Sequence, residues 1–123
     1  MTLDRDLFTI YYQMARHLLT DFELMILLAI LRVGEEAYGV PIAHEIESIG
    51  SRRVALGAVY TALDRLERNG LVSSSMGEPT PERGGRAKRF FQVTPPGLEA
   101  ARETQRALMA LWKDVPQLER GRA

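Results

Sequence analysis

Two clusters of cationic and hydrogen-bonding side chains give this chain its clearest chemistry. The first lies between residues 52 and 68 and combines arginines with small and hydroxyl-bearing residues: Arg52, Arg53, Gly57, Ala58, Tyr60, Thr61, Arg65 and Arg68. The second follows a loop and consists of Arg83, Arg86, Lys88 and Arg89. Arginine and lysine bind phosphate groups, and small residues let a backbone approach a large ligand closely. The two clusters therefore favour binding to a nucleic acid.

Catalysis finds little support among the other residues. The chain has no cysteine, and no nucleophile motif lies near its two histidines, His17 and His44. Glu45 beside His44 has no second metal ligand one helical turn further on, and the segment GEPTPERGGR lacks the Lys-Ser/Thr ending of a phosphate-binding loop. We therefore expect no catalytic residue, no metal and no cofactor in a protein that is not an enzyme.

The charges of the chain are unevenly placed, although 16 basic and 16 acidic residues give a formal net charge of zero. Residues 1–50 hold three basic and eight acidic side chains, whereas residues 51–90 hold eight basic and four acidic ones. A basic middle segment can focus a positive field on one face of the molecule. The alternative is an ordinary solvated charged surface, and charge alone does not separate the two.

The length of 123 residues predicts one domain. The longest uncharged apolar run, Leu24–Leu31, is shorter than the ~18 residues of a membrane span. The first residues include Asp4 and Asp6 and do not read as a secretion signal. With the lack of cysteine, these features predict a cytoplasmic protein.

The first basic cluster requires a helix to position it. Val59, Leu63 and Leu66 recur at helical spacing, and Gly70 follows where a helix usually stops, before the strand-like Leu71–Met76. One face of this helix can therefore pack on a core while the other carries the cations.

Three further helices are expected before it. An amphipathic helix covers residues 4–17, and Thr20 and Glu23 then form a capping box for an apolar helix, the expected central buried one, that ends at Gly34. A shorter helix begins near Pro41, packs through Ile42, Ile46 and Ile49, and ends at Gly50. Two short helices, the second carrying the cations, make a helix-turn-helix pattern.

After this pattern come a hairpin and a last helix. Leu71–Met76 and Lys88–Val93 predict two strands around the Gly- and Pro-rich residues 77–85. Thr94 then caps a helix with Pro95 at its first position. The expected fold class is α+β, mostly α: a winged helix-turn-helix with an added N-terminal helix and a C-terminal dimerisation helix.

This order of elements, together with several sequence blocks, resembles the PadR family of bacterial transcriptional regulators. The blocks are Leu19-Thr20 through Ile30-Leu31, Tyr38-Gly39-x-x-Ile42, Gly57-Ala58-Val59-Tyr60-x-x-Leu63-x-x-Leu66-x-x-x-Gly70-Leu71-Val72, and Gly85-Arg86-x-Lys88-Arg89-Phe90-Phe91-x-Val93-Thr94-x-x-Gly97. The resemblance implies a homodimeric winged helix that represses transcription and often releases DNA when a small effector binds. It runs from about Leu19 to Leu111.

The chain departs from the family pattern in three places. Val40 follows the glycine where the family commonly has an aromatic residue, and Glu78 and Glu82 lie among the cations of the wing tip. One final helix makes the chain similar to the shorter members. The expected division is an N-terminal dimerisation helix at 1–18, the winged helix at 19–94, a dimerisation helix at 95–115 and a frayed tail at 116–123.

Each residue of the basic clusters has an expected role in DNA binding. The helix that carries the first basic cluster is the expected recognition helix. Near its start, Gly57, Ala58 and Thr61 would approach base edges. Tyr60 would contact a phosphate or sugar, or else seal the helix against the hairpin. Phosphate contacts are expected from Arg52 and Arg53 before the helix and from Arg65 and Arg68 on its side. The alternative for Arg65 and Arg68 is pairing to Asp64 or Glu67. Wing contacts are expected from Arg86 and from either Lys88 or Arg89, because neighbouring strand residues face opposite ways.

The first and last helices carry apolar stripes that a second copy of the chain would cover. The expected interface residues are Leu7, Ile10, Tyr11, Met14, Leu98, Ala101, Gln105, Leu108 and Trp112. The resemblance places a small aromatic effector at Met109 and Trp112, with plain interface packing as the alternative. Two functions remain open at this point: a dimeric repressor of a pseudo-palindromic operator, or a winged-helix module that binds proteins and has weak or lost DNA binding.

Overall fold

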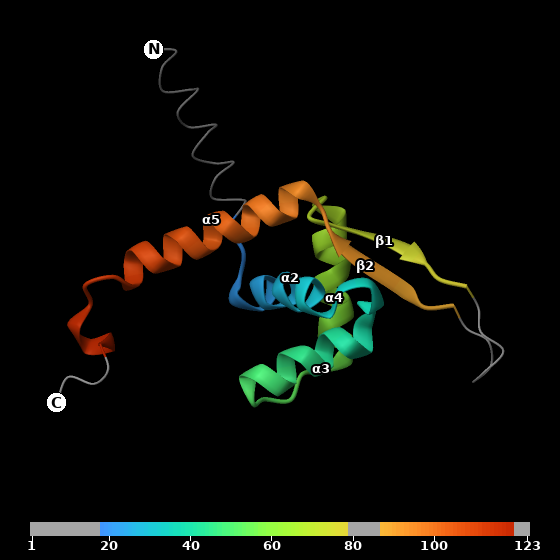
Figure 1. The fold of residues 1–123 in the computed structure, drawn as a ribbon, viewed down its shortest axis with the longest axis horizontal. Helices are drawn as coiled ribbons and strands as arrows, with labels where there is room; N and C mark the ends of the chain where they lie inside the picture. The colour runs from blue at the N-terminus through green and yellow to red at the C-terminus, as the bar shows by residue number, and fades with distance from the viewer. Residues whose placement is uncertain (1–17, 79–86, 120–123) are drawn as a thin grey trace, which may run out of the picture.

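The computed structural model describes residues 18–78 and 87–119. Its elements are, in chain order, α2 (Asp21–Val33), the 3₁₀ turn η1 (Gly34–Glu36), α3 (Gly39–Gly50), α4 (Leu56–Arg68), β1 (Val72–Met76), β2 (Arg89–Val93), α5 (Pro95–Trp112) and the 3₁₀ turn η3 (Pro116–Leu118). The hairpin extends to one side of the packed helices α2, α3 and α4, and α5 extends to the other (Figure 1). The predicted mostly helical, winged helix-turn-helix fold is confirmed. The helix expected at residues 4–17 lies outside the described residues.

The capping box at the start of α2 is confirmed. The Thr20 hydroxyl accepts a hydrogen bond from the Glu23 amide at 3.1 Å, and the Glu23 carboxylate accepts one from the Thr20 amide at 2.9 Å. Gly34 ends the helix with a φ of 84°. Helix α2 is the expected central helix, with Ile26 and Leu27 fully buried, but it is buried on one side only, because Met25, Leu28 and Leu31 are 39–48% exposed. The described elements pack on one side of α2 and leave an apolar strip on the other.

Helix α3 begins and ends slightly away from its expected bounds. Gly39 is its first residue and Pro41 its third, which is still within the turn whose amides have no helical partner. At the other end Ser51, and not Gly50, takes the left-handed conformation that closes the helix, with a φ of 57°. Ile49, expected to pack, is 62% exposed.

The two strands form the expected antiparallel hairpin, in which Val72 pairs with Val93 and Met76 with Arg89. Residues 79–86, and with them Arg83, Glu82 and Arg86 of the wing tip, lie outside the described residues. The Phe91 amide donates a hydrogen bond to the Ala37 carbonyl at 2.8 Å. This bond attaches β2 to the segment between α2 and α3, so the wing is anchored on the helix-turn-helix.

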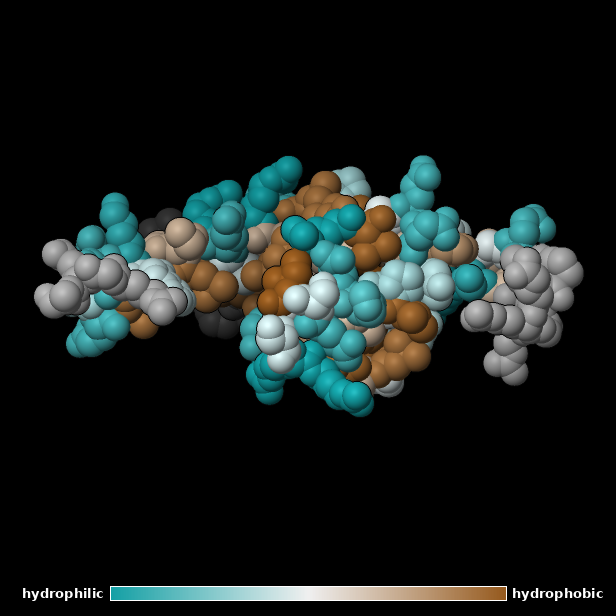
Figure 2. Space-filling view, turned by 60° about the horizontal axis from the view of Figure 1, so that its bottom comes forward, coloured by the Kyte–Doolittle hydropathy of each residue, from teal (hydrophilic) through white to brown (hydrophobic). Residues whose placement is uncertain are grey.

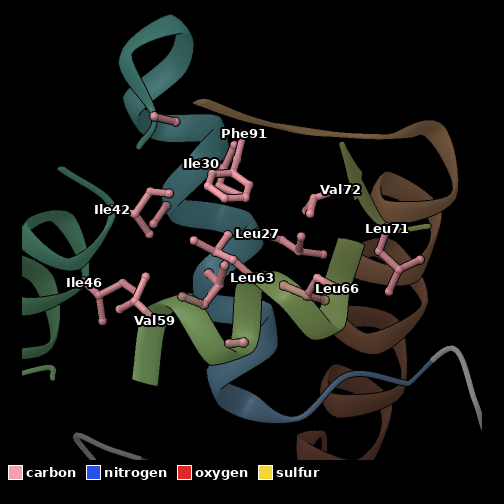
Figure 3. Close-up of a cluster of buried hydrophobic side chains, with 14 of the residues drawn as sticks. Leu27, Ile30, Ile42, Ile46, Val59, Leu63, Leu66, Leu71, Val72 and Phe91 are labelled. Carbon is pink, nitrogen blue, oxygen red and sulfur yellow. The ribbon is translucent and has the colours of Figure 1, made fainter. Parts of the chain in front are cut away.

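One hydrophobic core connects α2, α3, α4, both strands and the first turns of α5. Side chains from three helices and both strands meet in it (Figure 3): Leu27, Ile30, Ile42, Ile46, Val59, Leu63, Leu66, Val72 and Phe91. The helix-turn-helix and the wing therefore fold as a single unit.

The first turns of α5 attach it to this core. Thr94 caps it by accepting from the Gly97 amide at 3.2 Å, and its hydroxyl donates to the Gly70 carbonyl at 2.6 Å. The residues that α5 buries are Gly97, Ala100 and Thr104, and the Thr104 hydroxyl accepts from the Leu19 amide at 3.0 Å. The tail expected to fray from residue 116 instead starts with the turn η3. Within the two described ranges, no helix is long and apolar enough to cross a membrane.

Candidate nucleic-acid interface

Helix α4 divides into the two faces that its sequence predicted. Val59, Ala62, Leu63 and Leu66 are buried in the core. The opposite face is exposed and carries Gly57, Ala58, Thr61, Asp64, Arg65 and Arg68. The end of the helix also follows expectation, since Asn69 caps it and Gly70 has a φ of 78°. A helix buried along one side only presents its polar side as a ridge that a groove can accept.

The loop before α4 holds two exposed cations, Arg52 and Arg53. The Glu47 carboxylate accepts a hydrogen bond from the Val54 amide at 2.7 Å and so fixes the path of this loop. Within residues 18–78 and 87–119, neither arginine has a carboxylate partner. Both are thus available to a phosphate at the N-terminal end of α4.

The arginines of α4, Arg65 and Arg68, do not pair with the carboxylates of their own helix. Arg65 lies 3.9 Å from the Glu23 carboxylate on α2, and both its neighbours Asp64 and Glu67 face a different cation. Arg68 has no ion pair with any described residue. The pairs along the helix surface that stood as the alternative to phosphate contact therefore do not form among the described residues.

Arg89 on β2 is the cation that Asp64 and Glu67 face. Its guanidinium donates to Glu67 and, at 3.3 Å, to Asp64, while its Nε donates to the Ser74 hydroxyl at 3.2 Å. Ser74 in turn donates to Glu67 at 2.6 Å. Because these contacts turn Arg89 toward α4, its main effect is to neutralise two carboxylates beside the recognition surface.

Lys88 points away from Arg89, as strand alternation predicted. Its Nζ lies 4.6 Å from the centre of the Tyr38 ring, and Tyr38 meets Phe90 edge-on with 5.8 Å between the ring centres. Lys88 is exposed and keeps its charge at the surface. Of the two cations at the start of β2, Lys88, which precedes the strand, is thus the one placed to meet a ligand.

Tyr60 lies at the border between the two faces of α4. It is half-buried and packs against the core, yet within the described ranges its hydroxyl has no hydrogen-bond partner. Its ring lies directly over Gly39, the first residue of α3. Sequence reasoning missed this contact and the Arg89 cluster, because each joins residues more than 20 positions apart.

The outer half of α5 exposes apolar side chains, with Leu108 at 51%, Met109 at 60% and Trp112 at 59% exposed. Leu98 and Ala101 from the expected stripe are half-buried, and Gln105 is exposed. The left part of Figure 2, which holds the outer end of α5, shows hydrophobic residues among hydrophilic ones. This stripe lies beside the residues that α5 buries on its own body.

The chain matches the model of the Transcriptional regulator PadR-like family over residues 27–103. It is also 36% identical over 80 residues to the transcriptional regulator Rv3488 of Mycobacterium tuberculosis, an alignment that covers 65% of this chain and 70% of that protein.

Solved structures share the fold. A PadR-like transcriptional regulator of Bacillus cereus is 24% identical with a TM-score of 0.63, and the match covers 81% of this chain and 92% of that one. A transcriptional regulator of Clostridium thermocellum is 22% identical with a TM-score of 0.65, covering 78% and 87%. RosR of H. salinarum is 27% identical with a TM-score of 0.59, covering 78% and 79%. The matched segment contains the whole helix-turn-helix and wing described above, so the chain belongs to the PadR-like family and is a DNA-binding transcriptional regulator.

Proposed function

We propose that this regulator is a homodimeric repressor that reads a pseudo-palindromic operator, with α4 in the major groove and the wing at the adjacent minor groove or backbone. The observation that carries the proposal is the exposed ridge of α4. At its two ends stand cations without carboxylate partners in the described part of the chain: Arg52, Arg53 and Arg68. Residues 19–94 would form the DNA-binding unit.

The size of α4 suits the major groove. Its 13 residues span about 20 Å, and a major groove about 12 Å wide accepts one helix. Gly57, Ala58 and Thr61 lie on the exposed face of its first turns, where residues meet base edges. Gly57 has no side chain and Ala58 only a methyl group, so the helix backbone can come close to the bases there.

Phosphate contacts would flank this helix. Arg52 and Arg53 stand before it and Arg65 and Arg68 along its later turns, so the four can reach phosphates of the two strands that border the groove. Tyr60 adds, on the side of α3, a hydroxyl that has no hydrogen-bond partner among the described residues. These contacts position the helix and carry no sequence information themselves.

The wing would supply Lys88 and, from beyond the described residues, Arg86. A cation inserted at the minor groove is favoured where the groove is narrow. Arg89 would act without touching the DNA, because its pairing with Glu67 and Asp64 reduces the repulsion between these carboxylates and the phosphates.

A two-fold dimer would bury the exposed stripe of α5. Residues 95–115 would pair with a second copy through Leu98, Ala101, Gln105, Leu108 and Trp112, and the N-terminal stripe would join them through Leu7, Ile10, Tyr11 and Met14. The recognition helices would then stand one DNA turn apart, ~34 Å. A small aromatic effector would bind at Met109 and Trp112 between the paired helices. The protein would work in the cytoplasm, where the DNA is.

Binding to the DNA upstream of the protein's own gene tests the proposal. Fluorescence anisotropy compares this duplex with a scrambled one of equal length at 50 and 200 mM salt. A protein that contacts six or more phosphates loses affinity on the order of a thousandfold over this range. Selective, salt-sensitive binding supports the proposal, whereas no binding at low salt to this or any promoter fragment contradicts it and favours a module that binds proteins.

Repression is tested separately with a reporter gene behind the bound fragment. The proposal predicts lower expression when the regulator is present, and recovery when Arg52 and Arg53 are both changed to alanine. Increased expression in the presence of the regulator would show an activator.

A further inference from the structure

We propose that Gly39 is a positioning residue for DNA binding: the absence of a side chain there creates the space in which Tyr60 of the recognition helix is held. The inference rests on the proposed function, since it concerns how one DNA contact is preorganised. Gly39 lies on α3, whereas the helix that would enter the groove is α4.

The contact between the two residues is unusually close. A Cβ built on Gly39 would lie 2.3 Å from Cζ, 2.4 Å from the hydroxyl oxygen and 2.6 Å from Cε2 of Tyr60. Carbon and oxygen atoms in van der Waals contact stay about 3.5 Å apart. No other residue type can therefore occupy position 39 while Tyr60 keeps its present place.

Space, and not backbone conformation, is the reason for glycine at this position. Among the described glycines, Gly34 and Gly70 adopt a positive φ, whereas Gly39 does not. Gly39 is the first residue of a regular helix and is buried. The backbone at this position does not require glycine, so the ring over this residue is what opposes a side chain.

The pair Tyr38-Gly39 connects the recognition helix with the wing. The ring of Tyr60, from α4, packs against the backbone of Gly39. The ring of Tyr38 meets Phe90, from β2, and lies under the Lys88 ammonium. Two adjacent residues at the start of α3 thus support one contact residue of the helix and one of the wing.

A ring held in this way can bind DNA at a smaller entropic cost. Binding immobilises a free side chain at a cost in conformational entropy, and a side chain fixed beforehand avoids most of that cost. The Tyr60 hydroxyl has no partner among the described residues and is not fully buried, so it remains available to a phosphate. Gly39 acts through Tyr60 and need not touch DNA itself.

Alanine at position 39 should displace Tyr60 and leave the fold intact. The atoms in the way belong to the far end of a side chain that is only half-buried, so the ring can rotate outward. Gly97 offers a contrast, since a Cβ there would lie 2.1 Å from the Leu71 carbonyl oxygen, which is backbone and cannot rotate away.

The experiment is a double-mutant cycle on the full chain with Gly39→Ala, Tyr60→Ala and the two together. Gly50→Ala is the matched control, because Gly50 lies on the same helix and a Cβ there meets nothing within 4 Å. Each protein is assayed for affinity to the upstream duplex at several salt concentrations and for its melting temperature.

We expect Gly39→Ala to weaken binding roughly fivefold, the loss expected when a side chain must be immobilised on binding. Its salt dependence should match that of the wild type, because a neutral contact releases no counterion. In the Tyr60→Ala background, Gly39→Ala should cause no further loss of affinity. Gly50→Ala should bind like the wild type.

Three results would overturn the inference while the wild type binds DNA: wild-type affinity in Gly39→Ala, wild-type affinity in Tyr60→Ala, or an equal loss from Gly39→Ala with and without Tyr60. An unfolded Gly39→Ala chain that Tyr60→Ala does not restore would also overturn it. A wild-type chain that binds no DNA would instead remove the proposed function itself.

Discussion

At the scale of single residues, the arginines around α4 divide into those paired inside the molecule and those left to solvent. Arg89 is held by two carboxylates, and Arg65 lies within reach of Glu23. Arg52 and Arg68 have no such partner in the described ranges. A paired cation must give up one anion to gain another, so the unpaired arginines should contribute most to phosphate binding.

The first prediction concerns Arg68→Ala. It should weaken binding to all DNA sequences by a similar factor and reduce the slope of log affinity against log salt by about 0.9, the value for one lost phosphate contact. Measurement is by anisotropy over a salt series. Arg102→Ala on α5 is the control, since Arg102 pairs only with Glu99 there. An unchanged slope in Arg68→Ala would show that this arginine does not meet DNA.

Sequence patterns predicted which residues are cationic and which helix face carries them, but not how they pair. The spacing of Asp64, Arg65, Glu67 and Arg68 along one helix suggested local pairs. The carboxylates instead meet Arg89, which is 22 positions from Glu67. A pairing that depends on the approach of a strand to a helix cannot be read from periodicity within either.

At the scale of elements, the wing and the recognition helix are coupled through the cluster of Arg89, Ser74, Glu67 and Asp64. These four residues join β1, β2 and α4, and the Arg89 guanidinium also lies 5.0 Å from the centre of the Phe91 ring. The cluster is partly exposed, so its effect on stability is screened by solvent. Its larger effect should be on the charge that α4 presents to DNA.

The second prediction follows from this cluster. Arg89→Gln should weaken DNA binding by roughly fivefold, because two carboxylates without their cation repel phosphates by about 1 kcal/mol. Adding Glu67→Gln to the same chain should restore most of the loss. Anisotropy at 50 mM salt measures both, and failure of the second change to restore affinity would mean that Arg89 itself contacts the DNA.

The third prediction concerns the junction between the wing and α5. Gly97→Ala should lower the free energy of unfolding by about 1–3 kcal/mol, because the added methyl group meets the Leu71 carbonyl. Urea denaturation followed by circular dichroism measures the loss. Gly50→Ala is again the control, and equal stability of the two variants would contradict the close packing described here.

Element boundaries could be predicted where a local signal sets them. The Thr20 capping box, the Gly70 stop and the Thr94 cap all lie within a few residues of the atoms they bind or the helices they end. Burial could not be predicted as well, since Ile49 and Leu31 have the same pattern as core residues yet remain exposed. Which stripe finds a partner depends on the neighbouring elements, which a single helix does not specify.

At the scale of the whole molecule, the described part of the chain leaves apolar surface uncovered on α2 and on the outer half of α5. Soluble proteins rarely expose large contiguous apolar patches without a partner. A second copy of the chain would cover this surface and place two recognition helices on one side of the DNA.

The fourth prediction tests this dimer. Leu108→Glu or Trp112→Glu should convert the protein to monomers, because a charge would be buried in an apolar interface. Both residues are more than half exposed in the single chain, so neither change should disturb the fold. Sedimentation velocity measures the mass. Ala110→Glu, on the opposite face of α5, adds the same charge and should leave the dimer intact; dissociation by all three variants alike would argue against a specific stripe.

The most direct test of the proposed dimeric DNA binding is a hydroxyl-radical footprint of the regulator on the DNA upstream of its own gene. A homodimer that reads a pseudo-palindrome predicts two protected half-sites related by a two-fold axis, with centres ~34 Å or one helical turn apart. The Trp112→Glu variant should lose both protections together at low protein concentration. A single unsymmetrical protected segment at saturation, or uniform protection of the whole fragment, would contradict binding as a two-fold dimer.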